Sequence, residues 1–465
     1  MGYTSCSYQV SQGRDLHDGY DTRDACTRRS VDSIITPGWV FPVAPPGQLL
    51  SDCSIVVDEG RIIALLPTAE AQRQFQGERE FKLPQSLVMP GLINTHGHAA
   101  MTLLRGFADD LALEAWLNER IWPAESRWVG EDFVREGTEL AVAEMLLSGI
   151  TTCSDMYFFP DQVTRVMRQS GMRCQIAFPI LEFASNWARD ADEYIHKGLA
   201  LHDECRDEAL VDIAFGPHAP YTVSDDTFTK LLALAGELDA HVHIHVHETA
   251  GEVANALAET GRRPLQRLYE LGGLSSTTQC VHMTQIDDTD IRLLQQTGAH
   301  VVHCPQSNLK LGSGICPVAN LAEAGINVAL GTDGAASNNT LNLFSAMNFA
   351  SLLAKGLSGN AQAVGIEDAL AMATLNGARA LGLDREIGSI ETGKRADLAA
   401  VDLSSITSQP LYNPLSQLVY TDCAPLVSHV WVDGRLLVEN RALKTLDTAA
   451  VLRRAGQWRS KIIGS

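Results

Sequence analysis

The middle of the chain, from about residue 89 to residue 388, alternates short apolar runs with longer amphipathic segments. Apolar residues recur at helical spacing in the longer segments, most clearly in EDFVREGTELAVAEMLLS and SDDTFTKLLALAGEL. The short runs are rich in β-forming residues, and eight follow one another: LVMPGLINTHGH, GITTCSDMY, RCQIAFPI, VDIAFGPHAP, HVHIHVHET, TQCVHMT, HVVHCPQSN and NVALGTDG. This alternation predicts an α/β fold of the (β/α)8 TIM-barrel type, with an open, doubly wound sheet as the alternative.

The two ends of the chain carry a different pattern, with short strands and tight turns. Between residues 35 and 88, CSIVVDEGRIIALLP predicts a hairpin that turns at Asp58-Glu59-Gly60. Between residues 389 and 450, SHVWVDGRLLVEN predicts another that turns at Asp433-Gly434. We therefore expect one small β-sandwich domain built from both ends. Residues 1–34 are polar and patternless, which predicts a disordered extension or an upstream read-through of the true start.

The composition argues against some classes of partner. The chain has 36 basic and 56 acidic residues and a formal charge of -20, whereas nucleic acid and anionic membranes call for a basic surface. The N-terminus lacks the apolar core of a signal peptide, and no run approaches the length of a membrane span. The ten cysteines are scattered without a C-x-x-C pair, which indicates thiols in a reducing cytoplasm.

Polar side chains capable of chemistry fall at the ends of the predicted barrel strands. Barrel enzymes carry their active sites at the C-terminal ends of the strands, so this placement supports both the barrel and a site. The residues are His96, His98, Asp155, His218, His245, His247, Glu248, His282, His303 and Asp333.

Two histidine patterns are compatible with a metal. His96 and His98 are two residues apart on a predicted strand and so point to the same face, where both imidazoles can reach one ion. A histidine pair on a wet surface would look the same, so this pair alone leaves both interpretations open. In HVHIHVHETA, four histidines alternate from residue 241 to residue 247, but only the last positions of a barrel strand reach its mouth.

The segment MPGLINTHGH resembles the first metal-binding strand of the amidohydrolase superfamily, and GSIETGKRADLAAVDL resembles that superfamily's return into its small β domain. The resemblance covers nearly everything after residue 35. It implies a metal bound by His96, His98, His245 and Asp333. Binuclear members bridge two metals with a lysine on strand four, but VDIAFGPHAP has no lysine. One divalent ion, Zn2+, is therefore expected.

The same resemblance assigns the catalytic roles. It implies that Glu248 is the general acid/base, that His282 polarises the water or the substrate, and that Asp333 also accepts a proton from the water. The simpler interpretation of Asp333, which precedes a glycine, is a turn former. For His241 and His243 we expect interior filling or a hydrogen bond to backbone, and for His241 the alternative is a place in the preceding loop.

We expect His247 to line or support the site, and we assign no role to His303. Together with the metal, the acid/base carboxylate favours hydrolysis of a C–N bond on an electron-poor ring.

Four segments resemble the 5'-methylthioadenosine/S-adenosylhomocysteine deaminases of the TRZ/ATZ-like group: HAAMTLLRGFADDLALEAWLNERIWPAES, FGPHAPY, SNLKLGSGICPV and LGTDGAASNNTLNLF. This resemblance implies an adenosine-type nucleoside as substrate, with Glu125 binding the ribose hydroxyls and His218 contacting the nucleoside. It places Trp116 as an apolar wall and Arg189 against the carboxylate of a homocysteine tail. Each residue also has a simpler interpretation. Glu125 could be an exposed helix charge and His218 a strand-end histidine bound to a loop. Trp116 could pack in the core, and Arg189 could form a surface ion pair.

Two other functions stay open at this point. One is deamination or dechlorination of another heterocycle, such as an s-triazine. The other is a non-catalytic scaffold of the same fold, although every expected metal ligand and Glu248 are present. The resemblance also allows a homo-oligomer, for which the sequence identifies no interface.

Overall fold

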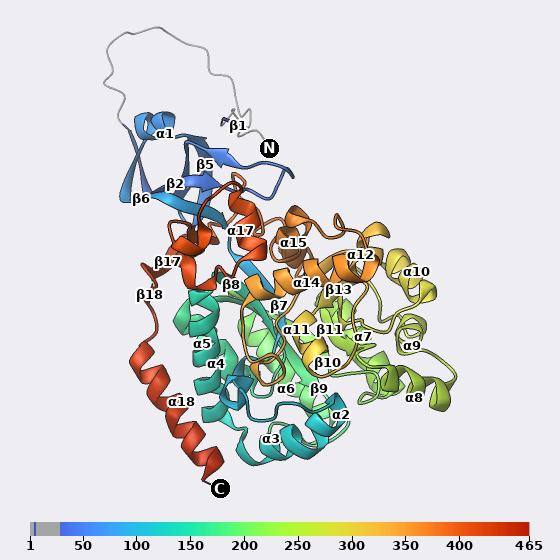
Figure 1. Cartoon of the computed structure of the whole chain (residues 1–465). Helices are drawn as coiled ribbons and strands as arrows, with labels where there is room; N and C mark the ends of the chain where they lie inside the picture. Colours follow the sequence, from blue (N-terminus) through green and yellow to red (C-terminus); the bar gives the residue numbers. More distant parts are fainter. Residues whose placement is uncertain (1–3, 6–27, 465) are drawn as a thin grey trace.

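The computed structural model describes residues 4–5 and 28–464. A barrel of strands surrounded by helices forms the larger unit, and a separate sheet lies at one end of it (Figure 1). No helix among the described residues is long and apolar enough to cross a membrane.

The barrel contains eight parallel strands that neighbour one another in chain order. They are β7 (Leu92–Gly97), β8 (Ile150–Asp155), β9 (Arg173–Ile180), β10 (Val211–Pro217), β11 (Val242–Val246), β12 (Thr278–His282), β13 (His300–His303) and β14 (Val328–Leu330). The first and last strands meet where Thr95 Oγ1 donates to Leu330 O over 2.8 Å and Asp333 N donates to His96 O over 3.0 Å. The predicted (β/α)8 barrel is confirmed.

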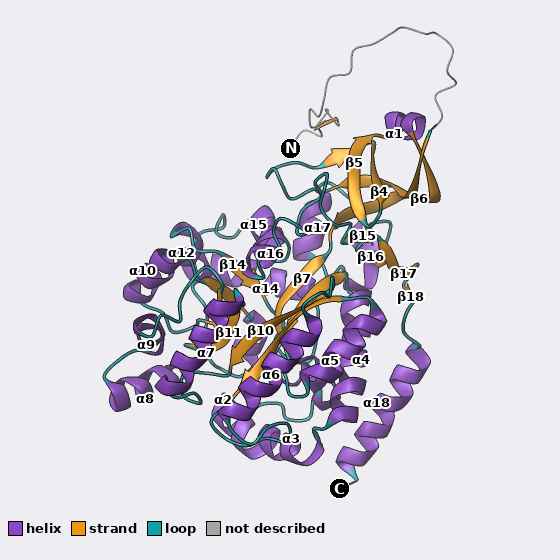
Figure 2. Cartoon of the chain, turned by 180° about the vertical axis from the view of Figure 1, so that it is seen from behind, coloured by secondary structure: helices purple, strands orange, loops and turns teal. Residues whose placement is uncertain are grey.

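Helices cover the outside of the barrel on all sides visible in Figures 1 and 2. In the predicted segment SDDTFTKLLALAGEL, Ser224 caps the helix by accepting from Thr227 N, and Phe228, Leu231 and Ala235 form its buried stripe. The longer covering helices are α4 (Glu131–Leu147), α5 (Pro160–Ser170), α6 (Ala191–Cys205), α7 (Asp225–Leu238), α8 (Ala250–Thr260), α10 (Asp288–Thr297) and α14 (Leu343–Ser358). Shorter ones are α9 (Pro264–Glu270), α11 (Pro305–Lys310), α12 (Val318–Glu323), α13 (Ala335–Asn338), α15 (Ile366–Met372) and α16 (Leu375–Ala380).

Both ends of the chain build the second unit, a ten-stranded sheet. Parallel pairing joins β2 to β6, and antiparallel pairing joins β6 to β15 from the other end of the chain. Both predicted hairpins are present, one between β4 and β5 and one between β16 and β17. The strands are β1 (Thr4–Ser5), β2 (Arg29–Val40), β3 (Leu50–Ser51), β4 (Cys53–Asp58), β5 (Arg61–Pro67), β6 (Phe75–Pro90), β15 (Leu398–Asp402), β16 (Val427–Val432), β17 (Arg435–Glu439) and β18 (Ala442–Leu443). The helices of this end are α1 (Thr68–Gln74) and α17 (Pro414–Tyr420).

The unit boundaries differ in detail from those expected. Strand β2 begins at Arg29, before the expected boundary at residue 35, because Val31 and Ile34 are buried and continue the strand pattern backwards. Residues 1–3 and 6–27 of the expected extension lie outside the described residues. At the other end, α18 (Thr448–Ile463) leaves the sheet and lies along α4, where Trp458 Nε1 donates to Glu136 over 2.7 Å (Figure 1).

A buried ion pair joins the two units. Arg173 at the start of β9 donates from Nε to Asp397 Oδ2 over 2.9 Å, directly before β15. Both side chains are almost fully buried. A buried charge is tolerated only when it is paired, and here the pair lies between the sheet and the barrel, which also share an apolar core.

Candidate active site

A cavity of about 430 Å³ opens at the C-terminal ends of the barrel strands. Its floor carries His98, His245, Glu248, His282 and Asp333, and its walls are mainly apolar. One wall comes from residues 113–128, which follow β7 and include α2 (Leu113–Ala115) and α3 (Trp122–Trp128). The position agrees with the expectation that the site lies at the strand ends.

Three histidines and an aspartate converge on the floor. The Nε2 atoms of His96 and His245 are 3.2 Å apart. Asp333 Oδ1 lies 3.4 Å from His96 Nε2 and 3.3 Å from His98 Nε2. The four residues expected to bind a metal thus fall into two groups that share His96: His96 with His98 and His245, and His96 with Asp333 and His282.

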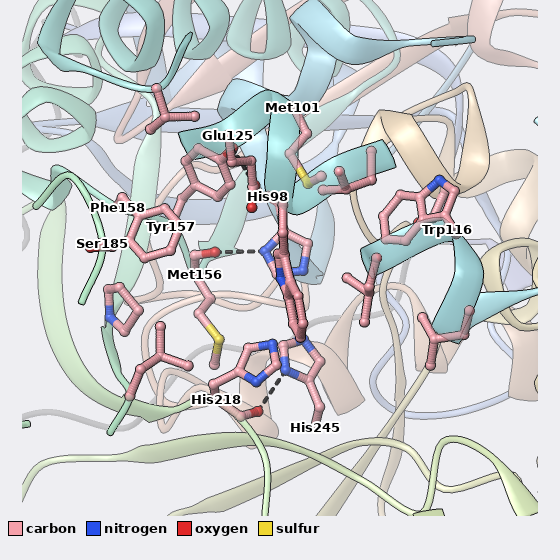
Figure 3. Close-up of a pocket in the computed structure, with 18 of the residues that line it drawn as sticks. His98, Met101, Trp116, Glu125, Met156, Tyr157, Phe158, Ser185, His218 and His245 are labelled. Atoms are coloured by element: carbon pink, nitrogen blue, oxygen red, sulfur yellow. Dashed lines mark hydrogen bonds between the residues drawn. The ribbon is translucent and has the colours of Figure 1, made fainter. Parts of the chain in front are cut away.

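The opposite ring nitrogens are held by acceptors. His98 Nδ1 donates to Met156 O over 2.6 Å, and His245 Nδ1 donates to His218 O over 2.7 Å (Figure 3). A carbonyl oxygen can only accept, so the proton of each ring is on Nδ1 and the lone pair is on Nε2. Unshared pairs and a carboxylate that face one another repel unless a cation lies between them. This donor set therefore fits a divalent metal ion.

Burial favours the neutral form of two of the histidines expected to bind a metal, His96 and His245. It lowers the pKa of His96 to about 4, although Asp333 opposes the shift. Burial also lowers the pKa of His245 well below its usual value. A metal ligand has to be unprotonated, so these rings are ready to bind near neutral pH.

Glu248 stands beside the metal ligands on the loop after β11. Its Oε2 lies 3.7 Å from His282 Nε2, and its Oε1 accepts from Ser313 Oγ over 3.3 Å. Burial raises the pKa of Glu248, with His282 opposing. The carboxyl therefore holds a proton more readily than an exposed glutamate, as a general acid requires.

The loop that carries Glu248 is fixed from α8. Glu252 accepts the backbone N–H of His247 over 3.0 Å and that of Glu248 over 2.7 Å. His247 has a φ of 55°, in the left-handed region. Its ring is fully buried and its Nε2 accepts from Leu265 N over 3.1 Å, so it supports the loop and does not line the cavity.

The upper part of the cavity contains a second carboxylate, away from the metal ligands. Glu125 on α3 accepts from the Tyr157 hydroxyl over 2.6 Å, and both side chains line the cavity. Burial raises the pKa of Glu125 to about 7, with the Tyr157 hydrogen bond opposing. Figure 3 shows Glu125 and Tyr157 on one side of His98 and Trp116 on the other.

Two further residues expected to bind substrate reach the cavity and one does not. Trp116 and His218 line it, and His218 Nδ1 is within 3.0 Å of Thr222 Oγ1. Arg189 is not part of the lining; its side chain is 83% exposed and pairs with Glu193 one helical turn away. Arg189 lies two residues before α6 (Ala191–Cys205), and its side chain faces solvent, outside the lining of the cavity.

The remaining histidines have distinct surroundings. His241 lies just before β11, as the loop interpretation expected. His243 is fully buried and contacts the ring of His96, with 2.8 Å between its Nε2 and His96 Nδ1. His303 is buried at the end of β13, and its Nδ1 has no hydrogen-bond partner among residues 28–464.

Sequence reasoning missed two residues that contact the site. Tyr157 follows the end of β8, and its position two residues after Asp155 was the available signal. Asn308 accepts from His282 Nδ1 over 2.8 Å and so turns Nε2 of that ring towards Glu248. Asn308 lies on α11, and nothing in the sequence pattern points to this contact.

Comparison with known proteins identifies the family of this chain. Residues 87–437 match the model described as Amidohydrolase family. A 5-methylthioadenosine/S-adenosylhomocysteine deaminase of Saccharophagus degradans is 54% identical over 432 residues, covering 93% of this chain and 97% of that protein. The relative of the same name from Teredinibacter turnerae is 52% identical over 433 residues, covering 93% and 98%.

Solved structures of similar proteins have the same fold as this chain. A zinc-bound adenosine deaminase from Xanthomonas campestris has a TM-score of 0.93 and 46% identity, covering 94% of this chain and all of that one. An atrazine chlorohydrolase from Arthrobacter aurescens, at 23% identity and a TM-score of 0.86, covers 92% of this chain and 99% of its own and shares the fold. The chain belongs to the amidohydrolase family.

Proposed function

We propose that the protein is a zinc-dependent deaminase of adenosine-type nucleosides, acting on 5'-methylthioadenosine, S-adenosylhomocysteine or both. The observation that carries this proposal is the placement of Glu125 in the same cavity as the histidine–aspartate group and Glu248. The names of relatives at 52% and 54% identity support it. Water replaces the amino group of the adenine ring, giving the inosine-type product and ammonia.

His96, His98, His245 and Asp333 would hold one zinc ion. Four protein ligands leave a further position for water, an arrangement that catalytic zinc accepts. When bound, the ion supplies a Lewis acid that lowers the pKa of that water. Strand β10 carries no lysine that could bridge a second ion.

Glu248 would move the protons. Burial raises its pKa, which favours the protonated form from which it would donate to a ring nitrogen and make the neighbouring carbon electrophilic. Asp333 accepts the proton released by the attacking water. His282, with its Nδ1 proton held by Asn308, would orient the reacting groups beside Glu248.

The second carboxylate would recognise the sugar. Glu125 can accept from both hydroxyls of a ribose diol, and Tyr157 fixes the orientation of its carboxylate. The apolar wall that includes Trp116 and Leu117 suits a methylthio group or another uncharged 5'-substituent. His218 lies on the floor next to His245, where it would contact the nucleoside.

A triazine is disfavoured by the same carboxylate. Triazines and free bases have no diol, so binding either would leave Glu125 desolvated without a matching donor, a cost of roughly 1–3 kcal/mol or more. The scaffold alternative is disfavoured because all four expected metal ligands converge.

A substrate panel tests this proposal. Absorbance assays with zinc-loaded protein should give the highest kcat/KM for a nucleoside, at least about 100-fold above adenine, guanine or a triazine. Glu125→Gln should reduce nucleoside deamination and leave zinc content unchanged. A free base or triazine as the best substrate would refute the nucleoside assignment and leave the metal-dependent hydrolase intact.

We also propose a cytoplasmic location and self-association. Cys153 and Cys174 are thiols with sulfur atoms 3.4 Å apart, which suits a reducing compartment. Phe349 and Leu352, three residues apart on α14, are exposed apolar side chains that a second copy could cover. Fractionation and light scattering test the two statements separately.

A further inference from the structure

A row of hydrogen-bonded polar side chains crosses the interior of the barrel, starting at His96. His96 Nδ1 meets His243 Nε2 at 2.8 Å, and His243 Nδ1 meets Gln279 Oε1 at 2.5 Å. Gln279 Nε2 donates to Gln175 Oε1 over 2.7 Å, and Gln175 Nε2 donates to Asp212 Oδ2 over 3.0 Å. We propose that His243 and Gln279 are positioning residues, which hold His96 in the tautomer and orientation that zinc binding needs.

The direction of the hydrogen bonds follows from Gln279. Its Nε2 faces two oxygen atoms, Gln175 Oε1 and, at 2.9 Å, the carbonyl of Ala380. A carbonyl only accepts, so this end of the amide is the NH2 group and the other end is the oxygen. His243 Nδ1 must therefore donate to Gln279 Oε1, and its Nε2 carries a lone pair.

That lone pair determines the tautomer of His96. Because His243 Nε2 can only accept, His96 must carry its proton on Nδ1. His96 Nε2 then offers its lone pair on the side of Asp333, His98 and His245. His98 and His245 obtain the same tautomer from backbone carbonyls, whereas His96 obtains it from a side chain.

Asp212, at the end of the row away from His96, gives a second argument for the direction of the hydrogen bonds. Asp212 is exposed at the beginning of β10, and its carboxylate can only accept, so the amide nitrogen of Gln175 faces it. Gln175 Oε1 then faces Gln279, in agreement with the direction set by Ala380. The two ends are independent, and both give His243 the same tautomer.

Burial favours a specific role for this row. His243 and Gln279 are fully inaccessible, and Gln175 is nearly so. Barrel interiors are normally filled by branched apolar side chains, and buried polar groups cost free energy unless every bond is made. A purely structural role would affect the stability of the protein alone. A positioning role would affect the affinity for zinc, since partners of ligand histidines are commonly worth about 10- to 100-fold in metal affinity.

The experiment measures zinc affinity by chelator competition and thermal unfolding of the metal-free protein. His243→Leu should weaken zinc binding about 10- to 100-fold. His243→Gln should recover most of this loss, because a glutamine amide reaches about the position of the imidazole Nε2 and can accept from His96 Nδ1. Zinc affinity of His243→Leu within twofold of wild type, or equal losses in both variants, would overturn the proposal.

Two further variants complete the test. Gln279→Met keeps His243 and removes its acceptor, so zinc affinity should fall in the same direction by a smaller factor, since Ser154 Oγ remains 3.4 Å from His243 Nδ1. This variant carries the test if His243→Leu fails to fold, and an unchanged affinity would count against the proposal. His429→Leu removes a buried histidine stacked on Trp431 in the small sheet and should not alter zinc binding.

The inference rests on the proposed zinc site, and the two can fail separately. Wild-type protein that binds no zinc would refute the proposed function. Wild-type protein that binds zinc no better than His243→Leu would refute only the role of His243.

Discussion

The three histidines proposed to bind zinc are oriented before any metal arrives. Each is held at Nδ1 by a different acceptor: a side chain for His96, and the carbonyls of Met156 and His218 for His98 and His245. Such contacts reduce the reorganisation that metal binding requires. At this scale, the chemistry depends on which nitrogen carries the proton as much as on which residue is present.

Glu248→Gln tests the proton-transfer role. Glutamine keeps the shape of the side chain but cannot pass a proton through the cycle, so turnover should fall about 10²–10⁴-fold. Elemental analysis should find the same zinc content as in wild type, since Glu248 is not one of the expected ligands. A variant with more than half of the wild-type turnover would show that Glu248 is not the acid/base.

Glu125 gives the stability of the protein a pH dependence with a defined sign. Burial, opposed by the Tyr157 hydrogen bond, raises its pKa from 4.5 to about 7. Between these values the folded protein holds a proton that the unfolded chain has lost. Its contribution to stability is therefore complete below about pH 4.5 and is lost as the pH rises through about 7.

Glu125→Gln removes this titration. The unfolding temperature of the variant, relative to wild type, should be higher at pH 8 than at pH 5. The metal-free protein is the right sample, because a nearby cation would stabilise the carboxylate. A difference that is equal at both pH values, or larger at pH 5, would contradict the raised pKa.

At the scale of the elements, the positions of the strands could be predicted from the sequence, whereas the contacts made by side chains outside the strands could not. Eight apolar runs predicted eight barrel strands, and the strand ends predicted the floor of the cavity, because every parallel strand of a barrel delivers its C-terminal residue to the same face. The directions of helix side chains were not predictable. Arg189, just before α6, points to solvent, whereas Asn308 on α11 reaches His282, and neither direction is encoded in a local pattern.

The junction between β11 and α8 yields a prediction of its own. Glu252→Gln replaces one of the two carboxylate oxygens by an NH2 group, so only one of the two backbone N–H groups keeps its acceptor. The loop should shift, and turnover should fall by roughly 10- to 100-fold, because small displacements of a catalytic group are costly. Chelator competition should give a zinc affinity close to that of wild type. Unchanged turnover would mean that another contact fixes Glu248.

At the scale of the whole molecule, the candidate site belongs to only one of the two units. The barrel carries every residue of the candidate site, and the sheet from the chain ends is anchored to it through the Arg173–Asp397 pair. The pairing of distant ends was predictable because both have the same hairpin pattern. The start of β2 at Arg29 was not, because polar residues alternate with buried Val31 and Ile34 in a stretch that resembles the extension before it.

Titration of the metal-free protein with zinc, followed by deamination of 5'-methylthioadenosine, tests the central claim most directly. One site built from His96, His98, His245 and Asp333 predicts that activity rises with added zinc and levels off at one equivalent per chain. A plateau at two equivalents would contradict the single-ion site. Zinc-loaded protein that releases no ammonia from this nucleoside, or metal-free protein that is fully active, would contradict the account as a whole.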